Sequence, residues 1–190
     1  MAFMYSEIVG VDPNNGKLLW SHAHPVDFGL NTSTPVWDAD NLLFMSSGYG
    51  GGSRVLKLSR AGEKTTVEEL WANRLMRIHF SNAIRVGDLI YGSSGDFGPA
   101  PFTAINVKTG NVAWRHRSFP RASFLYADGR FIILDEDGQL TLATATAEGL
   151  TVQSKVNLLN NQSWTVPSLS GTRLYVRDRK NILALDLGTQ

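Results

Sequence analysis

Histidine is the residue type in this chain that could most readily bind a metal, and two of the four histidines are close together. His22 and His24 are alternate residues, so on a strand both imidazoles would project from one face. A metal site would need a third ligand such as Asp27, His79 or His116, and nothing in the spacing makes these residues converge. We therefore predict no metal site, and the plainer interpretation is that these are solvent-exposed loop histidines.

Catalytic signatures are missing from the sequence. The glycine-rich segment 49–53 (YGGGS) lacks the Lys-Ser/Thr pair of a phosphate-binding loop, and no nucleophile elbow, HExxH or dinucleotide motif is present. Without cysteine there is no disulfide, thiolate zinc site or thiol nucleophile. We predict no catalytic residue and favour a protein that is not an enzyme.

The overall charge balance limits the classes of partner. The chain has 18 Lys and Arg against 17 Asp and Glu, which gives a net charge of +1 and no bulk attraction to nucleic acid or to an anionic membrane. No apolar run reaches the roughly 20 residues of a membrane helix, and the first ten residues lack the pattern of a signal peptide. We expect a soluble chain with no nucleic-acid binding and no membrane insertion.

The elements that must position any site are short β-rich segments, which recur along the whole chain. The segment GVDPNNGKLLW at 10–20 aligns with AINVKTGNVAW at 104–114, and Gly and Trp keep the same spacing in both. Partial copies occur at 56–71, at 143–149, which lacks the tryptophan, and at 184–190. The copies recur at intervals of roughly 40 to 48 residues, which is typical of propeller blades.

A second landmark recurs in step with the first. Turn residues followed by a short aliphatic or aromatic strand occur at 40–44, 87–91, 128–132 and 171–175. Each repeat then has four strands, A to D, and roughly seventeen strands are expected in all. The predicted fold is an all-β propeller of four-stranded antiparallel blades, with about four blades in an open arc or half-ring of a larger propeller.

The chain is therefore interpreted as a single propeller segment. Its expected parts are blade fragments at 1–24, blades at about 31–71, 79–117 and 121–157, and a partial blade at 163–190. Successive blades bury their faces against one another, so the recurring tryptophans are expected to pack between blades. The repeat residues given this structural role are Trp20, Trp71 and Trp114, with Gly16, Gly62 and Gly110 in the turns before them.

The repeat resembles that of the pyrroloquinoline-quinone (PQQ) enzyme family, whose β-propellers carry a recurring tryptophan-docking motif. The same repeat is similar to that of non-enzymatic relatives, notably the propeller lipoprotein of the outer-membrane β-barrel assembly machinery. The resemblance to these relatives implies an exported bacterial protein of the periplasm or cell envelope. It also implies no chemistry by itself, because one fold hosts many functions.

The quinoprotein dehydrogenases that this repeat resembles hold PQQ with calcium, a stacking tryptophan and usually a vicinal disulfide. The present chain has no cysteine. Its acidic segment 135–138 (DEDG) is better explained as a hairpin turn than as a calcium site, because calcium takes six to eight oxygen ligands. We predict no cofactor.

Alternation of strand direction places the D-to-A and B-to-C connections at one rim of the propeller. All four histidines and several arginines lie in D-to-A connections, and two long B-to-C connections at 48–53 and 93–101 lie beside them, so we expect a basic, loop-rich rim. The candidate binding residues are His22, His24, Tyr49, Arg74, Arg77, His79, Asp96, Phe97, Arg115, His116, Arg117 and Arg121.

The favoured function is a non-catalytic scaffold that presents this rim to a protein or peptide partner. Two alternatives stay open: a fragment of a PQQ-dependent dehydrogenase-like or other propeller enzyme, and a carbohydrate or small-anion binder that uses Tyr49, Phe97 and the rim arginines. An open arc would leave flat blade faces and strand edges exposed, so we also predict self-association or completion by missing blades.

Overall fold

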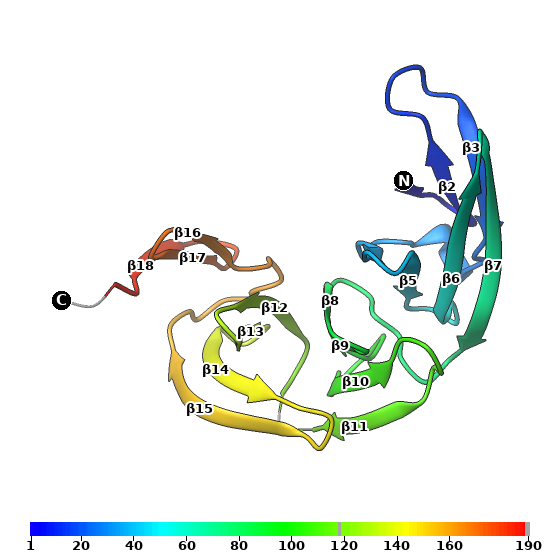
Figure 1. The fold of residues 1–190 in the computed structure, drawn as a ribbon. Helices are drawn as coiled ribbons and strands as arrows, with labels where there is room; N and C mark the ends of the chain where they lie inside the picture. The colour runs from blue at the N-terminus through cyan, green and yellow to red at the C-terminus, as the bar shows by residue number, and fades with distance from the viewer. Residues whose placement is uncertain (118, 189–190) are drawn as a thin grey trace.

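A computed structural model describes residues 1–117 and 119–188 of the chain, and these residues form five antiparallel sheets in an open arc (Figure 1). The first sheet contains β1 (Ala2–Phe3), β2 (Glu7–Val11) and β3 (Leu18–Ala23). The second contains β4 (Val36–Trp37), β5 (Leu42–Ser47), β6 (Gly52–Ala61) and β7 (Lys64–Asn73). The third contains β8 (Ala83–Val86), β9 (Leu89–Ser93), β10 (Phe102–Asn106) and β11 (Val112–His116).

The remaining strands repeat this organisation. The fourth sheet contains β12 (Ala122–Ala127), β13 (Arg130–Asp135), β14 (Gln139–Ala145) and β15 (Leu150–Asn157), and the fifth contains β16 (Ser168–Ser170), β17 (Arg173–Arg177) and β18 (Ile182–Asp186). One short 3-10 turn, η1 (Asp27–Gly29), connects the first and second sheets. The prediction of an all-β propeller with antiparallel, mostly four-stranded blades in an open arc is confirmed.

Each sheet is a simple meander in which sequential strands are neighbours. In Figure 1 the strands β7, β11 and β15 follow the outside of the arc, whereas β8 and β12 lie nearer its centre. The described residues contain eighteen strands, one more than expected, because Ala2 and Phe3 pair with Val9 and Ile8. Two residues are too few to give the alternating pattern by which the longer strands were found.

The hydrophobic core is divided among the spaces between successive sheets. One buried cluster joins Ile8 of the first sheet to Leu43 and Leu56 of the second, and three similar clusters follow along the arc. Strand β5 is buried at all six positions because it lies inside the second sheet, with another sheet against each face. Since no sheet buries both faces alone, the stacking of sheets is what stabilises the fold.

The repeat tryptophans lie at these contacts between sheets. The indole Nε1 of Trp71 on β7 donates a 2.7 Å hydrogen bond to the carbonyl of Val107 in the third sheet. In the same way, Trp114 on β11 donates a 2.9 Å hydrogen bond to the carbonyl of Thr146 in the fourth. Trp20 packs against the cluster between the first and second sheets.

Turn glycines precede two of these tryptophans closely. Gly16 and Gly110 have φ of 75° and 71°, in the left-handed region that glycine adopts without steric cost. Gly149, at the corresponding place in the fourth copy, is not among the glycines with positive φ, and its hairpin is shorter: Thr146 N donates to the carbonyl of Gly149, whereas Asp12 N donates to the carbonyl of Lys17 in the first copy. The fourth repeat therefore departs from the pattern in its turn as well as in its missing tryptophan.

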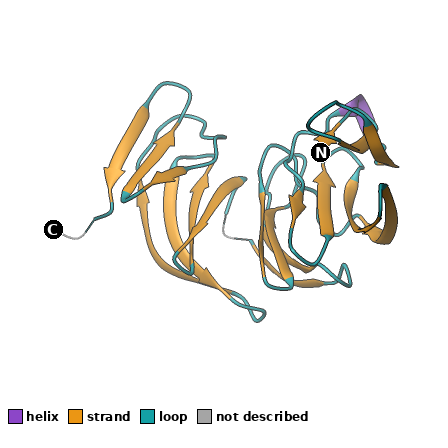
Figure 2. Ribbon diagram, turned by 45° about the horizontal axis from the view of Figure 1, so that its top comes forward, coloured by secondary structure: helices purple, strands orange, loops and turns teal. Residues whose placement is uncertain are grey.

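The two ends of the arc lie apart, and the first and fifth sheets share no strand in the part of the chain that the structure describes (Figures 1 and 2). Residues 189 and 190, the last two positions of the expected partial blade, lie outside the described residues. Among the described residues, no helix has the length and apolar character needed to cross a membrane.

Candidate binding rim

Aromatic and charged side chains from the connections between sheets contact one another in a continuous row at one rim. The row runs from the connection between β5 and β6 to the turn between β17 and β18, so it crosses the second to fifth sheets. We call it the rim cluster, and its members are Tyr49, Arg77, His79, Phe80, Asp96, Phe97, Arg121, Glu136, Trp164 and Arg179.

Tyr49 begins the row, and its backbone is strained. Its φ is 44°, in the left-handed region that a bulky side chain seldom adopts. Phe28 has a φ of 62° and packs edge-on against Tyr49 with ring centroids 5.4 Å apart. Tyr49 also contacts His79 at 4.4 Å and Phe97 at 5.4 Å between centroids. Such strain costs on the order of 1–3 kcal/mol per residue and persists only where surrounding contacts fix the conformation.

An aromatic stack forms the middle of the row. Phe80 and Trp164 stack with centroids 4.9 Å apart and planes 18° apart, although they come from different connections. The guanidinium of Arg121 lies 5.4 Å from the Phe80 centroid and 5.7 Å from that of Trp164, and Arg179 lies 5.4 Å from Trp164. Cation–π contacts of this kind hold arginine and aromatic side chains in fixed relative positions.

Asp96 links two of the arginines. Its carboxylate Oδ2 accepts a 2.9 Å hydrogen bond from Arg77 Nη1, and its backbone carbonyl accepts a 2.8 Å bond from Arg121 Nη2. The other carboxylate oxygen, Oδ1, is buried and has no hydrogen-bond partner among the described residues. The structure therefore brings together three of the residues that the sequence assigned to the rim.

His79 is the most deeply buried polar member of the rim cluster. Its side chain is enclosed by Tyr49 and Phe80, and within the described chain neither ring nitrogen has a hydrogen-bond partner. Burial and the positive charge of Arg121 lower the pKa of His79, against the opposing effect of Asp96. This shift favours the neutral imidazole, which has one donor and one acceptor.

Glu136 fixes the far side of the row. Its Oε2 accepts a 2.9 Å hydrogen bond from Trp164 Nε1 and lies 3.6 Å from Arg121 Nη1. Two shallow hollows of about 290 and 230 Å³ adjoin Glu136 on the rim. Pro99 and Arg117 line the larger of the two. The row thus has recesses beside it that can receive side chains.

Two of the four histidines are buried, which corrects the expectation of solvent-exposed loop residues. His24 is fully buried beside Phe3, and its Nε2 lies 3.0 Å from Ser47 Oγ. Burial, followed by the positive charges of Arg54 and His22, lowers the pKa of His24 to about 4. These residues are buried because the connections turn inward between sheets instead of remaining at the surface.

The other two histidines lie in strands and not in connections, which is a further correction. His22 pairs with Ile8 near the end of β3, and His116 pairs with Phe102 at the last residue of β11, because β-pairing extends further than the sequence indicated. His22 Nε2 lies 2.9 Å from Glu69 Oε2. The described residues contain no cluster of three or more His, Asp or Glu side chains that could hold a metal ion.

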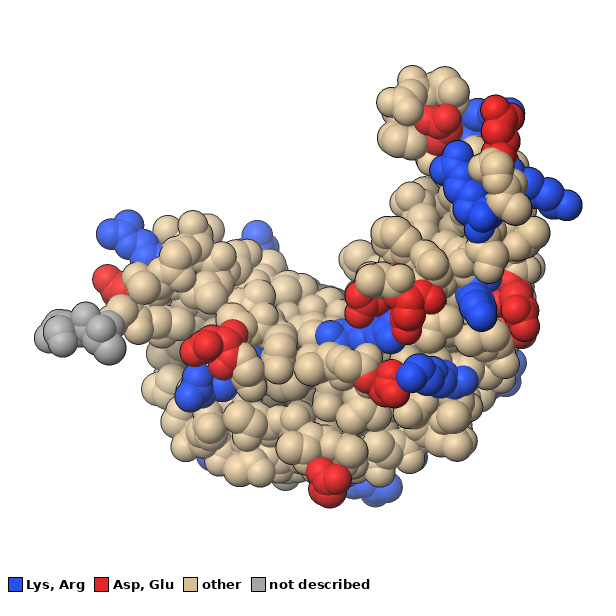
Figure 3. Space-filling model, in the orientation of Figure 1, with Lys and Arg blue, Asp and Glu red and all other residues tan. Residues whose placement is uncertain are grey.

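The rim is less basic than the sequence suggested. Arg77 and Arg121 are paired with acidic side chains, and Arg115 donates to the carbonyl of Leu75. Arg74 and Arg117 are exposed, and within the described residues neither has a carboxylate at ion-pair distance. On the face drawn in Figure 3, positive and negative side chains also alternate instead of forming a field of one sign.

Sequence reasoning missed Phe80, Glu136, Trp164 and Arg179 as members of the row. Phe80 directly follows His79, and Trp164 lies in the connection between β15 and β16, which reaches the same rim by the strand-direction argument. That argument could have selected Trp164, because it lies outside the repeat position of the other tryptophans. The stacking of Phe80 on Trp164 had no sequence signal, since the two residues are far apart in the chain.

The acidic segment 135–138 has the structure of a hairpin turn. Asp135 Oδ1 accepts hydrogen bonds from the backbone N–H groups of Asp137, at 3.1 Å, and Gln139, at 2.9 Å. Burial raises the pKa of Asp135, against the lowering effect of these hydrogen bonds. A carboxylate used in this way supplies little of the oxygen set that calcium requires, so the segment does not fit the calcium ion of a quinoprotein site.

Comparison with known proteins identifies the family. The family model described as "Outer membrane protein assembly factor BamB" matches residues 1–116, which is more than half of the chain. The chain therefore belongs to this family of PQQ-like repeat propellers. No curated protein matches the chain.

Solved structures share the fold at low sequence identity. BamB from Moraxella catarrhalis superposes with a TM-score of 0.51 and 15% identity, over 95% of this chain and 66% of that protein. Apo AztD from Citrobacter koseri superposes with a TM-score of 0.56 and 14% identity, over 95% of this chain and 54% of that protein. The chain thus spans less than two thirds of the length of either protein.

Proposed function

We propose that this chain is a non-catalytic scaffold that binds a protein or peptide partner through the rim cluster. One observation carries the proposal: aromatic rings and guanidinium groups from the second to fifth sheets contact one another in a continuous row. Aromatic residues and arginine contribute most of the binding energy at protein interfaces. Because the row rests on stacked sheets, little ordering is needed when a partner binds.

The exposed members of the row suggest the chemistry of the partner. Phe97 is 78% exposed and Phe80 is 39% exposed, so both offer apolar surface to a ligand. The exposed side chains of Arg74 and Arg117 favour acidic residues beside the apolar contacts. An extended peptide with apolar side chains and carboxylates matches this pattern better than a compact small molecule.

The family also supports a place of action. Its model is described as an outer-membrane protein assembly factor, and a BamB structure is among the solved structures with this fold. We therefore propose that the chain acts in the periplasm or cell envelope as part of a protein assembly.

Peptide selection tests the proposal directly. Short random peptides displayed on phage are selected on the immobilised chain, and the selected peptides are then measured by fluorescence polarisation. We expect Phe97→Ser and Arg121→Gln to weaken binding by about tenfold or more, as for central interface residues. Trp37→Ser is the matched control, because Trp37 is 54% exposed on β4 and is not part of the row. Equal binding by all three variants would contradict the proposal.

The same protein sample tests the other hypotheses. We propose that the chain acts without PQQ, and a spectral shift or a higher melting temperature on addition of PQQ with calcium would contradict this. Specific capture on a glycan array, abolished by Tyr49→Ala or Phe97→Ser, would instead support the carbohydrate-binding alternative.

A further inference from the structure

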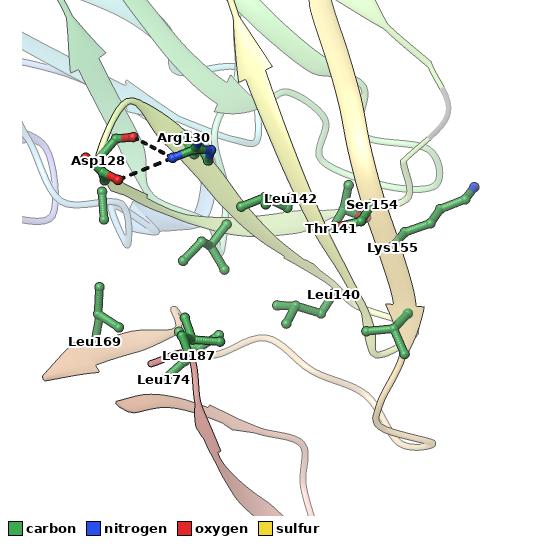
Figure 4. A pocket seen from close by; sticks show the side chains of 13 residues that line it. Asp128, Arg130, Leu140, Thr141, Leu142, Ser154, Lys155, Leu169, Leu174 and Leu187 are labelled. Atoms are coloured by element: carbon green, nitrogen blue, oxygen red, sulfur yellow. Dashed lines mark hydrogen bonds and ion pairs between the residues drawn. The ribbon is translucent and has the colours of Figure 1, made fainter. Parts of the chain in front are cut away.

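A hollow of about 550 Å³ lies between the fourth and fifth sheets, away from the rim cluster (Figure 4). Its walls are mainly aliphatic and include Leu140 and Leu142 of β14, Leu169 of β16 and Leu174 of β17. In Figure 4 these leucines surround an open space that Ser154 borders from β15. The volume is within the range of sites that bind drug-sized molecules.

The strand register shows why this space is open. In each of the first four sheets, the last two strands pair through a bulge. The residue of the last strand that is paired just before the bulge has the same structural position in all four sheets. These pairs are Gly10 with Trp20, Val55 with Trp71, Ala104 with Trp114, and Leu142 with Ser154. Ser154 therefore has the position that a tryptophan occupies in the three preceding sheets, and the hollow lies where the indole would pack.

The acceptor for such an indole is also in place. Trp71 Nε1 donates to the carbonyl of Val107, whose own N–H donates to the carbonyl of Asp88 in the preceding turn. In the fifth sheet, Leu187 N donates to the carbonyl of Thr172 in the corresponding turn, so Leu187 is the equivalent of Val107. Leu187 borders the hollow, and none of the described side chains donates to its carbonyl.

A positively charged residue borders the hollow. Lys155 follows Ser154 on β15 and is exposed, with its side chain pointing away from the leucines in Figure 4. Within the described residues no carboxylate lies at ion-pair distance from it, whereas Arg130 at the same hollow is paired with Asp128. A carboxylate beside the entering group would complement Lys155.

We propose that this hollow, the indole slot, binds a tryptophan side chain of a partner polypeptide that carries an acidic residue next to the tryptophan. The partner's indole would occupy the position that Trp71 and Trp114 occupy in their own sheets, and its N–H would donate to the Leu187 carbonyl. A polypeptide is favoured over free indole because the slot is larger than one ring and because the exposed Lys155 at its border would complement a carboxylate next to the tryptophan. The slot is separate from the rim cluster and does not rest on the proposed function.

The test measures binding to the full chain by isothermal titration calorimetry, using acetyl-Glu-Trp-Glu-amide, the matching peptide with Leu in place of Trp, and free indole as a competitor. We expect the Trp peptide to bind about tenfold more tightly than the Leu peptide, since the Leu peptide has neither the ring nor the donor. Equal binding of the two peptides would overturn the proposal. Competition by indole at the affinity of the Trp peptide would also overturn it, because the slot would then be a small-molecule site.

Substitutions at Ser154 and Lys155 locate the binding. Ser154→Trp fills the slot from within the chain. We expect it to raise the melting temperature and to weaken binding of the Trp peptide by about tenfold or more. Ser154→Ala should leave the melting temperature and the peptide affinity unchanged. Unaltered peptide binding by a stabilised Ser154→Trp protein would overturn the proposal. Lys155→Glu changes an exposed residue and should weaken the binding of acetyl-Glu-Trp-Glu-amide but not that of acetyl-Ala-Trp-Ala-amide. If Ser154→Trp does not fold, equal effects of Lys155→Glu on both peptides would overturn the proposal.

Discussion

The indole of Trp71 and the carbonyl of Val107 are joined by a 2.7 Å hydrogen bond that connects the second sheet to the third. Trp114 and Thr146 repeat the connection between the third and fourth sheets. Each tryptophan thus combines a large apolar contact with a directed polar one, which fixes how one sheet sits on the next.

Trp71→Phe should lower the free energy of unfolding by about 1–2 kcal/mol, because it keeps most of the apolar contact and removes the N–H donor to Val107. Trp71→Ala should cost about 3 kcal/mol or more, because it also removes the packing. Urea denaturation followed by circular dichroism measures both. Trp37→Phe is the control, since Trp37 is 54% exposed, and a loss as large in that variant would argue against the docking role.

Stability should fall as the pH is lowered from 6.5 toward 4, because His24 is buried. In the folded protein its pKa is lowered to about 4 by burial and by Arg54 and His22, whereas in the unfolded chain it is near 6.5. The unfolded state therefore binds a proton in this window that the folded state does not, so protonation favours unfolding. The stability that neutral His24 contributes is fully present above pH 6.5, and about 2 kcal/mol of this stability is lost at pH 5.

The variant His24→Gln isolates this contribution, because glutamine keeps a donor for Ser47 and does not titrate. Unfolding free energies from urea titrations at pH 5.0 and 7.5 should differ less in the variant than in the wild type, by about 2 kcal/mol. The pKa of His79 is also lowered, so its protonation also favours unfolding at low pH, but His79 is present in both proteins and its effect cancels in the comparison. An identical pH dependence in the two proteins would show that His24 does not contribute.

Arg121→Lys should disrupt the rim cluster although it keeps the charge. Arg121 donates to the Asp96 carbonyl, lies beside Glu136 and covers the rings of Phe80 and Trp164, and lysine has neither the planar group nor the fork of donors for these contacts. We expect a loss of about 1–2 kcal/mol in stability. A change in tryptophan fluorescence should accompany it and should be absent in a Trp164→Phe background. Arg117→Lys, at an exposed position, is the control.

Tyr49→Asn should raise the pKa of His79. Asparagine accepts the positive φ at this position, so the backbone can keep its shape, but the ring that covers the imidazole is removed. Hydration then stabilises the protonated form, and the pKa moves back toward 6.5. An NMR titration of the histidine Cε1–H signals measures this, with His79→Gln for assignment. Phe97→Ala removes a ring that contacts Tyr49, so a pKa increase as large in that variant would contradict the explanation.

Local pattern was enough to predict the fold. Turn residues and alternating apolar residues mark strands within a few positions, and the interval between copies of the tryptophan motif defines the blade. The same local information failed at β1, where two residues carry no period. It also failed for His24, because its burial depends on contacts with Phe3 and Ser47 that the repeat does not encode.

The candidate site was predicted only in part, because its contacts join distant connections. The shared rim follows from strand direction, so Tyr49, His79 and Asp96 could be placed near one another. Pairing of Arg77 with Asp96 depends on side-chain geometry, and so the sequence overstated the positive charge of the rim. The indole slot was hidden for another reason: the missing tryptophan of the fourth repeat was visible, but its replacement by Ser154 depends on the register of a bulge.

We expect the protein to self-associate through the ends of the arc. The first and fifth sheets form these ends (Figure 1). Both expose large apolar side chains: Tyr5, between β1 and β2, is 70% exposed, Leu18 on β3 is 58% exposed, and Ile182 on β18 is 73% exposed. Apolar side chains on an unstacked blade face favour pairing with another sheet. Light scattering after size exclusion should therefore give a mass above that of one chain, which rises with concentration. Ile182→Lys should shift the mass toward the monomer, whereas Lys64→Ala, at an exposed end of β7, should leave it unchanged. A wild-type chain that stays monomeric at high concentration would contradict the prediction.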